Sequence, residues 1–283
     1  MGQELSDDYI EQFHQEGFVL VPGLFTRQEA AQYIDHYMQL RAAGAQPGDD
    51  TDIDMDATDP LKRFPRLNQM HRWDMVSRDW LLSPRLANAL TAFADQEPFA
   101  IQTMMYFKPP GARGQALHQD QYFVRVKPGT CIAAWMALDA CDEENGCLHI
   151  VRGSHKLPLL CTVDADTTQS FSDVTVSLPP GMTSTPVVMQ PGDVLFFNGQ
   201  VIHGSYPNRS TERFRRALIG HYIAAEGQKV ARYYHPVLRM DGTEVILEDS
   251  LRGGPCGIWT EYGGKVTVEM RDEKANTAAP VHP

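Results

Sequence analysis

The feature of this sequence that most limits its fold is a long succession of short β-branched and aromatic runs from residue 99 to about residue 225. Proline, glycine or another turn-forming residue ends each run, as in "FAIQTMMYFKPPG" and "TPVVMQPGD". About seven or eight strands at this spacing are typical of an all-β sandwich or barrel. We therefore predict a mainly β chain with flanking helices, built on a double-stranded β-helix (a jelly-roll, cupin-like core) over residues 99–225.

The chain before residue 99 has a different pattern, because apolar residues recur there at helical spacing. Ser6 and Thr26 are good N-caps, and each precedes an amphipathic segment. We expect helices over residues 6–16, 27–42 and 83–95, and a short buried strand within residues 17–25. Residues 1–98 are thus predicted to form a helical layer on the β core. Residues 226–283 form a C-terminal extension, with a polar tail from about residue 266 that we expect to fray.

Acidic residues are concentrated in one part of the chain. The formal net charge is −11, and residues 48–59, "GDDTDIDMDATD", contain six aspartates and no cation. Binding to a phosphate backbone needs a basic face, so we expect no nucleic-acid partner, and we expect no membrane partner either. Residues 44–62 lack periodicity, and we predict a mobile acidic loop there that closes over a site as a lid.

The cysteines and the N-terminus indicate in which cellular compartment the protein is expected. The five cysteines are odd in number and include no CxxC pair, so we expect reduced, mostly buried thiols and no disulfide framework or zinc knuckle. The N-terminal "MGQELSDDYIEQF" has neither a basic nor an apolar region of a signal peptide. No apolar run is long enough to cross a bilayer. These observations predict a cytoplasmic protein.

A histidine and an aspartate stand two positions apart in "QALHQDQYFVRV", residues 115–126. On a strand, His118 and Asp120 would face the same way and Gln119 the opposite way. An imidazole and a carboxylate together suit a divalent transition metal such as iron. The motif alone is a weak signal, because it also fits a surface pair or a hydrogen-bonded pair.

A second segment, residues 190–222, strengthens the case for a site. It contains an apolar strand that ends in His203, then a loop, and then a second apolar strand that begins with Phe214, Arg215 and Arg216. Arg215 and Arg216 alternate faces, so one of them points inward. A buried guanidinium needs an anion, because burying it unpaired costs several kcal/mol.

These segments, with two others, resemble the phytanoyl-CoA dioxygenase family of iron(II)- and 2-oxoglutarate-dependent oxygenases. The matching motifs occur in the family's order, namely "EGFVLVPGLF", "LHQD", "NGCLHIVRGSHK" and "HGSYPNRSTERFRRAL". Arg152 is a departure, since the family usually has proline at that point of the turn. The resemblance implies a single oxygenase domain over residues 1–283.

The resemblance also implies a ligand set and a cosubstrate site. His118, Asp120 and His203 would form the catalytic 2-His-1-carboxylate triad that holds Fe(II) and leaves positions open for 2-oxoglutarate and O2. Arg215 would pair with the distal carboxylate of 2-oxoglutarate in the fork geometry of a guanidinium. Ser205 would donate a further hydrogen bond.

Four further residues match family positions. Met104 and Trp135 would line the cosubstrate pocket, Arg66 would contact the cosubstrate, and Gln102 would contact the substrate. Each residue also has a simpler interpretation. Met104 and Trp135 fit the core of any β-sandwich, and Gln102 and Arg66 fit ordinary surface or loop positions.

The resulting prediction is a dioxygenase that hydroxylates an unactivated C–H bond of a small metabolite or natural-product intermediate, with succinate and CO2 as co-products. Asp120 favours hydroxylation over chlorination, because related halogenases have a small residue in its place. One alternative is a non-redox, cupin-like metal-dependent isomerase or small-molecule binding protein, which would keep the triad without needing Arg215. Another is a catalytically silent scaffold.

Overall fold

The computed structural model describes residues 5–223, 226–251, 254–262 and 265–273. The predicted N-terminal helices are confirmed as α1 (Asp7–Glu16), α2 (Arg27–Ala42) and α5 (Pro84–Ala94). Thr26 caps α2, because its hydroxyl accepts from the backbone N–H of Glu29 at 3.1 Å and the Glu29 carboxylate accepts from the N–H of Thr26 at 2.8 Å. Three short helices were not predicted, α3 (Pro60–Arg63), α4 (Met75–Leu81) and α6 (Gln121–Val124).

The larger of two main sheets has eight strands, in the order β1-β10-β5-β12-β3-β14-β15, with β2 also paired to β3. The strands that pair within it are antiparallel. Their bounds are β1 (Phe18–Val21), β2 (Leu67–Asn68), β3 (Phe99–Tyr106), β5 (Cys131–Ala137), β10 (Val194–Asn198), β12 (Ala217–Ile223), β14 (Val237–Leu238) and β15 (Glu244–Val245).

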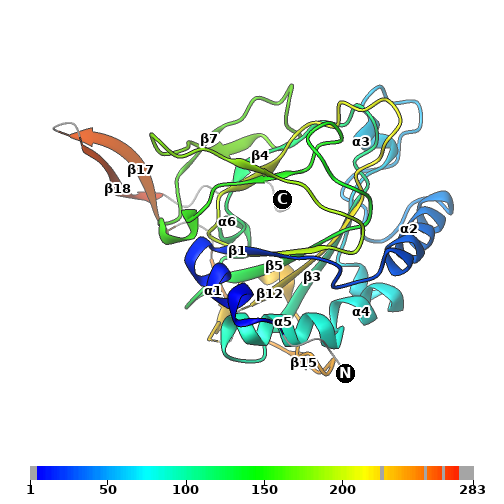
Figure 1. The fold of residues 1–283 in the computed structure, drawn as a ribbon, viewed down its shortest axis with the longest axis horizontal. Coiled ribbons are helices and arrows are strands. Elements are labelled where there is room, and N and C mark those ends of the chain that lie inside the picture. The colour runs from blue at the N-terminus through cyan, green and yellow to red at the C-terminus, as the bar shows by residue number, and fades with distance from the viewer. Residues whose placement is uncertain (1–4, 224–225, 252–253, 263–264, 274–283) are drawn as a thin grey trace.

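The smaller main sheet has the order β4-β11-β6-β9 and lies across from the larger one (Figure 1). Its strands are β4 (Gln115–His118), β6 (Leu148–Ile150), β9 (Thr185–Val187) and β11 (His203–Ser205). Three two-stranded pairs complete the described strands, β7 (Thr162–Asp164) with β8 (Val174–Val176), β13 (Lys229–Val230) with β16 (Glu248–Asp249), and β17 (Gly254–Tyr262) with β18 (Lys265–Glu273). The prediction of a mainly β chain is confirmed.

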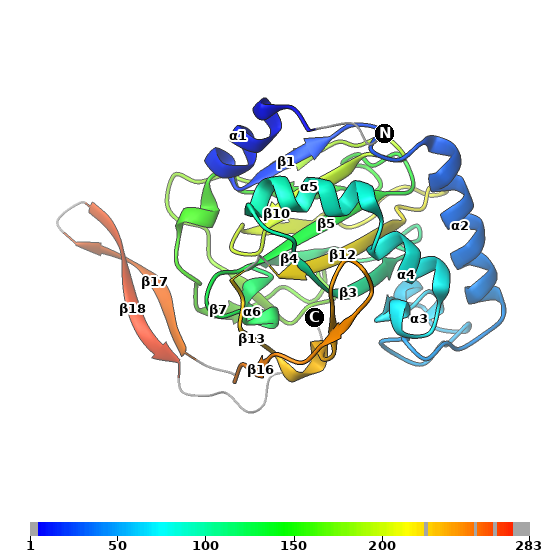
Figure 2. The ribbon, with the colours of Figure 1, turned by 90° about the horizontal axis from the view of Figure 1, so that it is seen from below.

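Both faces of the larger sheet are buried. In β5, Ala134 and Met136 pack in the cluster that includes the N-terminal helices, whereas Ala133, Trp135 and Ala137 belong to the cluster between the two sheets. Figure 2 shows α5 lying across the outer face of β10 and β5. Strand alternation therefore divides one apolar segment between a structural layer and the space in which a site can form.

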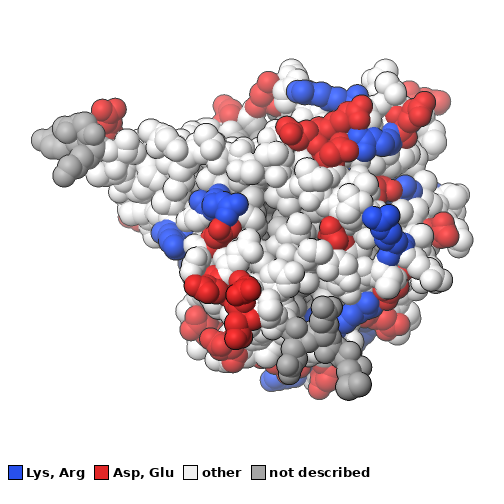
Figure 3. All heavy atoms as spheres, in the orientation of Figure 1, with Lys and Arg blue, Asp and Glu red and all other residues white. Residues whose placement is uncertain are grey.

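The acidic segment 44–62 is tied to the rest of the chain by ion pairs. Asp49 pairs with Arg41, Asp50 with Arg66, and Asp59 with Arg113 at 2.5–2.7 Å. The segment itself supplies no cation between residues 48 and 59, so these partners come from elsewhere in the fold. On the face drawn in Figure 3, acidic and basic side chains are intermixed. The role of this loop as a lid stays a prediction.

The C-terminal region contradicts two predictions. Residues 266–273 do not fray, because they lie in β18, which pairs with β17 over nine residue pairs and projects from the body (Figures 1 and 2). The remainder of the predicted tail lies outside the described residues. In addition, Cys161 and Cys256 form a disulfide, so the prediction of reduced thiols is wrong for this pair.

The disulfide could not be read from spacing, because the two cysteines lie 95 residues apart. The β17 strand brings them together, since Gly257 donates to the carbonyl of Leu159 and accepts from the N–H of Cys161 at 2.8 and 2.9 Å. Cys131, Cys141 and Cys147 are free and buried, as predicted. No helix in the described part of the chain is both long and apolar enough to span a bilayer.

The disulfide predicts a countable difference in thiol labelling. Protein purified without reductant and then denatured should be alkylated at three cysteines, and at five after reduction. Cys256→Ser should give four labelled cysteines without reductant, and should lower the free energy of unfolding by roughly 2–4 kcal/mol because a long loop is no longer closed. Intact-mass spectrometry and denaturant titration measure both effects. Five labelled cysteines in the unreduced wild type would show that the bond does not form.

Candidate metal centre

Two histidines meet because β4 and β11 are paired. His118 is the last residue of β4, His203 is the first residue of β11, and the two are direct register partners in the antiparallel ladder. Opposed residues of such a pair point to the same face of the sheet. Their imidazole rings accordingly lie with centroids 4.2 Å apart, and both side chains are buried.

Asp120 joins them by a different route from the one that strand alternation suggested. The strand ends at His118, and Asp120 has helical backbone angles (φ −58°, ψ −31°) directly before the short helix α6 (Gln121–Val124). The expected convergence is present, but a turn produces it. Gln119 points away, as predicted, and its amide bonds the carbonyl of Gln200 at 2.9 Å.

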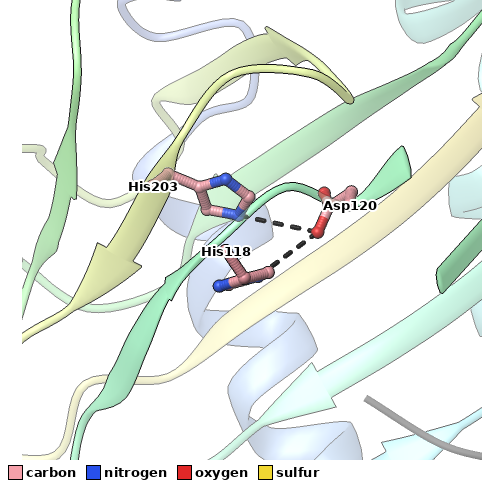
Figure 4. Close-up of side chains that lie close together, drawn as sticks. All are labelled: His118, Asp120 and His203. Carbon is pink, nitrogen blue, oxygen red and sulfur yellow. Dashed lines mark ion pairs between the residues drawn. The ribbon is translucent and has the colours of Figure 1, made fainter. Parts of the chain in front are cut away.

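The three side chains form a compact donor set (Figure 4). Oδ1 of Asp120 lies 3.3 Å from Nε2 of His118 and 3.6 Å from Nε2 of His203. One ligand atom from each residue lies within 4.8 Å of the others, and all three residues are buried. Two imidazole nitrogens and one carboxylate oxygen on one side are the donor set of a 2-His-1-carboxylate iron site. The residues therefore fit such an ion.

Hydrogen bonds behind the triad fix which atoms face the centre. Nδ1 of His118 donates to the carbonyl of Ala116 at 2.9 Å, and Nδ1 of His203 donates to that of Val201 at 3.0 Å. A carbonyl can only accept, so each Nδ1 carries the proton of the neutral ring and each Nε2 keeps a lone pair for a metal. The amide of Gln115 lies 3.2 Å from Nε2 of His118 and donates to that lone pair here.

The ionisation states also suit metal binding. Burial and the neighbouring His118 ring lower the pKa of His203 to about 4, so the ring is neutral near pH 7. Burial alone would raise the pKa of Asp120. The surrounding His203 and His221 rings, with a hydrogen bond from His221, instead hold that pKa well below its usual range. His221 donates from Nε2 to Oδ2 of Asp120 at 3.0 Å, leaving Oδ1 to face the two histidines.

Arg215 lies at one end of the same cavity. Its side chain is buried, its Nε donates to the carbonyl of Gly146 at 3.0 Å, and its guanidinium carbon lies 5.2 Å from the centre of the Trp135 ring. Among the described residues, no carboxylate lies within ion-pair distance of it. Burial lowers its pKa. The cation therefore faces the cavity without a counterion from the described chain.

The neighbouring arginines are neutralised elsewhere. Arg216 forms two bonds of 2.8 Å to the carboxylate of Asp139, and Arg213 pairs with Asp142 and Glu144. The expectation that Arg215 and Arg216 point to opposite faces is confirmed.

The other predicted site residues are only partly brought together. Met104, Trp135, Ser205 and Gln102 all line the triad cavity. Arg66 does not line it in the described structure. It lines an adjoining cavity of about 200 Å³, where it pairs with Asp50. Tyr106 lines both cavities and accepts from Arg66 at 3.2 Å, so Arg66 reaches the triad cavity only through the tyrosine.

Several lining residues were not predicted as site residues, including His221, Tyr106 and Phe197. A signal for His221 was present. Positions 215, 217, 219 and 221 share one face of a strand that continues to Ile223, so an inward Arg215 predicts an inward His221. Tyr106 has the same relation to Met104 on β3.

Comparison with known proteins places these features in a family. The model of the family described as phytanoyl-CoA dioxygenase (PhyH) matches residues 13–217. Phytanoyl-CoA dioxygenase 1 of Oryza sativa subsp. japonica is 30% identical over 56% of this chain and 56% of its own length, and a probable phytanoyl-CoA dioxygenase of Caenorhabditis elegans is 37% identical over 61% and 57%. A methylphosphonate hydroxylase of Gimesia maris is 25% identical over 83% and 87%.

Solved structures share the fold. The epimerase SnoN in complex with Fe3+, α-ketoglutarate and nogalamycin RO aligns with a TM-score of 0.65 at 19% identity, over 87% of this chain and 95% of SnoN. EvdO2 from Micromonospora carbonacea var. aurantiaca, complexed with 2-oxoglutarate, aligns with a TM-score of 0.62 at 22% identity, over 80% and 93%. These likenesses confirm the jelly-roll fold.

The chain spans about half the length of the first phytanoyl-CoA dioxygenases that it matches. Because the family model covers most of the sequence, the chain belongs to the phytanoyl-CoA dioxygenase (PhyH) family.

Proposed function

We propose that this protein is a non-haem Fe(II)- and 2-oxoglutarate-dependent dioxygenase. The observation that carries the proposal is one cavity with a buried His118, Asp120 and His203 donor set and a buried arginine that lacks an anion. A metal centre explains the first feature, and a cosubstrate carboxylate explains the second. Family membership, and solved relatives that hold 2-oxoglutarate or Fe3+, support the same cofactors.

In this proposal the protein orients the bound metal, cosubstrate and substrate, and these groups carry out the reaction. Iron, 2-oxoglutarate and O2 supply the oxidising chemistry, with succinate and CO2 as co-products. His118, Asp120 and His203 hold the metal in their present protonation states. Arg215 donates to the distal carboxylate of 2-oxoglutarate, with Ser205 as a second donor. Met104 and Trp135 form apolar walls that exclude water. We place the contribution of Arg66 behind Tyr106, which it orients.

The far end of the cavity is proposed to receive the substrate. Gln102 and His221 are register partners on β3 and β12, and both line the cavity. Nε2 of Gln102 and Nδ1 of His221 are buried without a hydrogen-bond partner. A polar group of the substrate would satisfy them, which supports Gln102 as a substrate-binding residue. Arg215 is the one lysine or arginine among the described lining residues, so we expect an uncharged group here.

The reaction is proposed to be hydroxylation of an unactivated C–H bond in a small metabolite or natural-product intermediate. The triad carboxylate is present, which favours hydroxylation over halogenation. Solved relatives nevertheless include an epimerase and a carbocyclase, so related folds carry other outcomes. A screen that follows succinate release under air with Fe(II), 2-oxoglutarate and a metabolite panel tests the proposal, and product mass then separates hydroxylation from isomerisation or ring formation.

The alternative is a non-redox, cupin-like isomerase or binding protein. It would use the same triad, but it gives no reason for a buried Arg215 that faces the metal cavity unpaired. Partners other than a small molecule are not proposed. The cytoplasmic location also stays a prediction, and the Cys161–Cys256 disulfide is more usual in oxidising compartments.

Removal of a triad ligand should weaken metal binding strongly and leave the fold intact. We expect Asp120→Ala and His203→Ala to weaken Fe(II) or Co(II) binding by at least about 100-fold, because loss of a supporting residue alone costs 10–100-fold. Equilibrium dialysis under anaerobic conditions measures this. His149→Gln is the matched control, since His149 lies on the adjacent strand β6 and bonds Ser184. An equal loss of metal affinity in the His149→Gln control, or unchanged metal affinity in the triad variants, would refute the assignment of the metal ligands.

Removal of Arg215 should separate the oxygenase from the cupin-like alternative. We expect Arg215→Ala to weaken 2-oxoglutarate binding by roughly 100-fold, since charged hydrogen bonds contribute about 1.5–3 kcal/mol each. Fe(II) affinity should stay unchanged. Anaerobic titration of the visible charge-transfer absorbance follows 2-oxoglutarate binding, and equilibrium dialysis follows Fe(II) binding. Arg216→Ala, which removes an adjacent cation paired with Asp139, should bind 2-oxoglutarate normally. Unaltered cosubstrate affinity in Arg215→Ala would favour the alternative.

A further inference from the structure

Lys108 is a buried lysine outside the metal donor set and the proposed cosubstrate contacts. It is 3% exposed and follows β3 in "YFKPPG". Its backbone has φ +32°, in the left-handed region that non-glycine residues seldom adopt. The carbonyl of Lys108 accepts from the backbone N–H of Arg215 at 3.0 Å. The main chain therefore ties Lys108 directly to the residue proposed to bind the cosubstrate.

The Lys108 side chain uses all three of its hydrogens on neutral acceptors. Its Nζ donates to Oγ of Ser205 at 2.8 Å, to the carbonyl of Gly146 at 3.3 Å, and to the carbonyl of Tyr206. In the ammonium form Nζ donates all three bonds, whereas a neutral amine would donate to the two carbonyls and accept from the Ser205 hydroxyl. No carboxylate of the described residues pairs with it. Burial, and then the charge of Arg215, lower the pKa of Lys108 well below its usual value.

Two buried cations thus meet at one backbone carbonyl. Gly146 accepts from Nε of Arg215 at 3.0 Å and from Nζ of Lys108 at 3.3 Å. Gly146 has φ +83°, and a Cβ there would lie 2.5 Å from the carbonyl oxygen of Tyr206, so only glycine fits. Two like charges at this position need an anion, because a dry environment strengthens their repulsion.

Ser205 transmits the effect of Lys108 to the cavity. Oγ of Ser205 accepts from Nζ of Lys108 at 2.8 Å and from the backbone N–H of Gln115 at 3.2 Å. A hydroxyl oxygen has two lone pairs, so both are occupied. The remaining hydrogen of Ser205 can only be donated, and Ser205 lines the triad cavity. The ammonium form of Lys108 therefore makes Ser205 an obligatory donor into the cavity that Arg215 also lines.

We infer that Lys108 is a positioning residue for an anion at this end of the cavity. It fixes Ser205 as a donor and adds a second positive charge behind Arg215, so that the cavity selects a 2-oxo acid with a distal carboxylate over one without it. This inference rests on the proposed function, because that function supplies the 2-oxo acid. Lys108 itself touches neither the metal nor the reacting atoms.

A purely structural role is the competing explanation. Lys108 also joins Gly146 to Tyr206, and a residue that merely holds two segments together would affect every ligand alike. Two probes separate these roles, 2-oxoglutarate and 2-oxopentanoate. The second has the same five-carbon chain and the same metal-binding end, but it lacks the distal carboxylate.

The test is anaerobic titration of Fe(II)-loaded full-length protein with each probe, followed by visible absorbance. Lys108→Met should weaken 2-oxoglutarate binding about tenfold, or about 1.4 kcal/mol. Its affinity for 2-oxopentanoate should change less than twofold. Lys108→Gln, which keeps a donor but no charge, should show a smaller loss that is still selective for 2-oxoglutarate, and it is the variant to use if Lys108→Met does not fold. Lys156→Met, at an exposed lysine, is the control for loss of one positive charge.

A double-mutant cycle with Ser205→Ala tests whether Lys108 affects 2-oxoglutarate binding through the Ser205 hydroxyl. If Lys108 acts through the hydroxyl, Lys108→Met should cost clearly less than tenfold when Ser205 is already absent. Equal weakening of both probes, an unchanged affinity for 2-oxoglutarate, or full additivity in the cycle would each overturn the inference. Failure of the proposed function gives a different result, because wild-type protein would then show no absorbance with either probe.

Discussion

The pairing of β4 with β11 is the interaction on which the site depends. It places His118 opposite His203, and a shift of one residue would turn one imidazole to the other face of the sheet. β11 is also paired with β6, so its position is fixed from both sides. Each histidine bonds the carbonyl two residues before it, at 2.9 and 3.0 Å. The same local arrangement thus orients both rings, and the strand pairing brings them together.

The larger sheet supplies the opposite wall of the cavity and determines its length. Its strand β12 carries alternate residues inward, from Arg215 just before the strand to His221 near its end. His221 bonds Asp120, whereas Arg215 lies at the other end with Trp135 and Gly146. This segment therefore spans the cavity from His221, beside the proposed metal ligand Asp120, to Arg215 at the proposed anion site. The N-terminal helices stabilise this arrangement from outside by burying the other face of the sheet.

The distribution of charge explains how an acidic protein can hold an anionic cosubstrate. The net charge is −11, and much of the acidic segment is neutralised locally by Arg41, Arg66 and Arg113. Inside, Lys108 and Arg215 lie close together without a carboxylate partner in the described chain. Buried charges interact strongly at short range, whereas exposed charges are screened by solvent and salt. The sign of the net charge of the whole chain is therefore a poor guide to the sign of the charge that lines this cavity.

The sequence by itself determined the strand-rich core, the helices α1, α2 and α5, and the residue types of the donor set. These follow from local periodicity, capping and motifs, which act over a few residues. Strand alternation also placed Arg215 and Arg216 on opposite faces correctly. The motifs "LHQD" and "HGS" carry part of the resemblance to the family, and that resemblance implied His118, Asp120 and His203 as the donor set.

Tertiary structure decided what depends on contacts between distant segments. The turn at Asp120, the partners of the acidic loop, and the Cys161–Cys256 disulfide all arise from such contacts. The same is true of Lys108, whose neighbours Gly146 and Ser205 lie 38 and 97 residues away. Its sequence context, a lysine before two prolines, resembles an ordinary surface turn. Only folding buries it beside a second cation, because burial and charge pairing are properties of the packed chain.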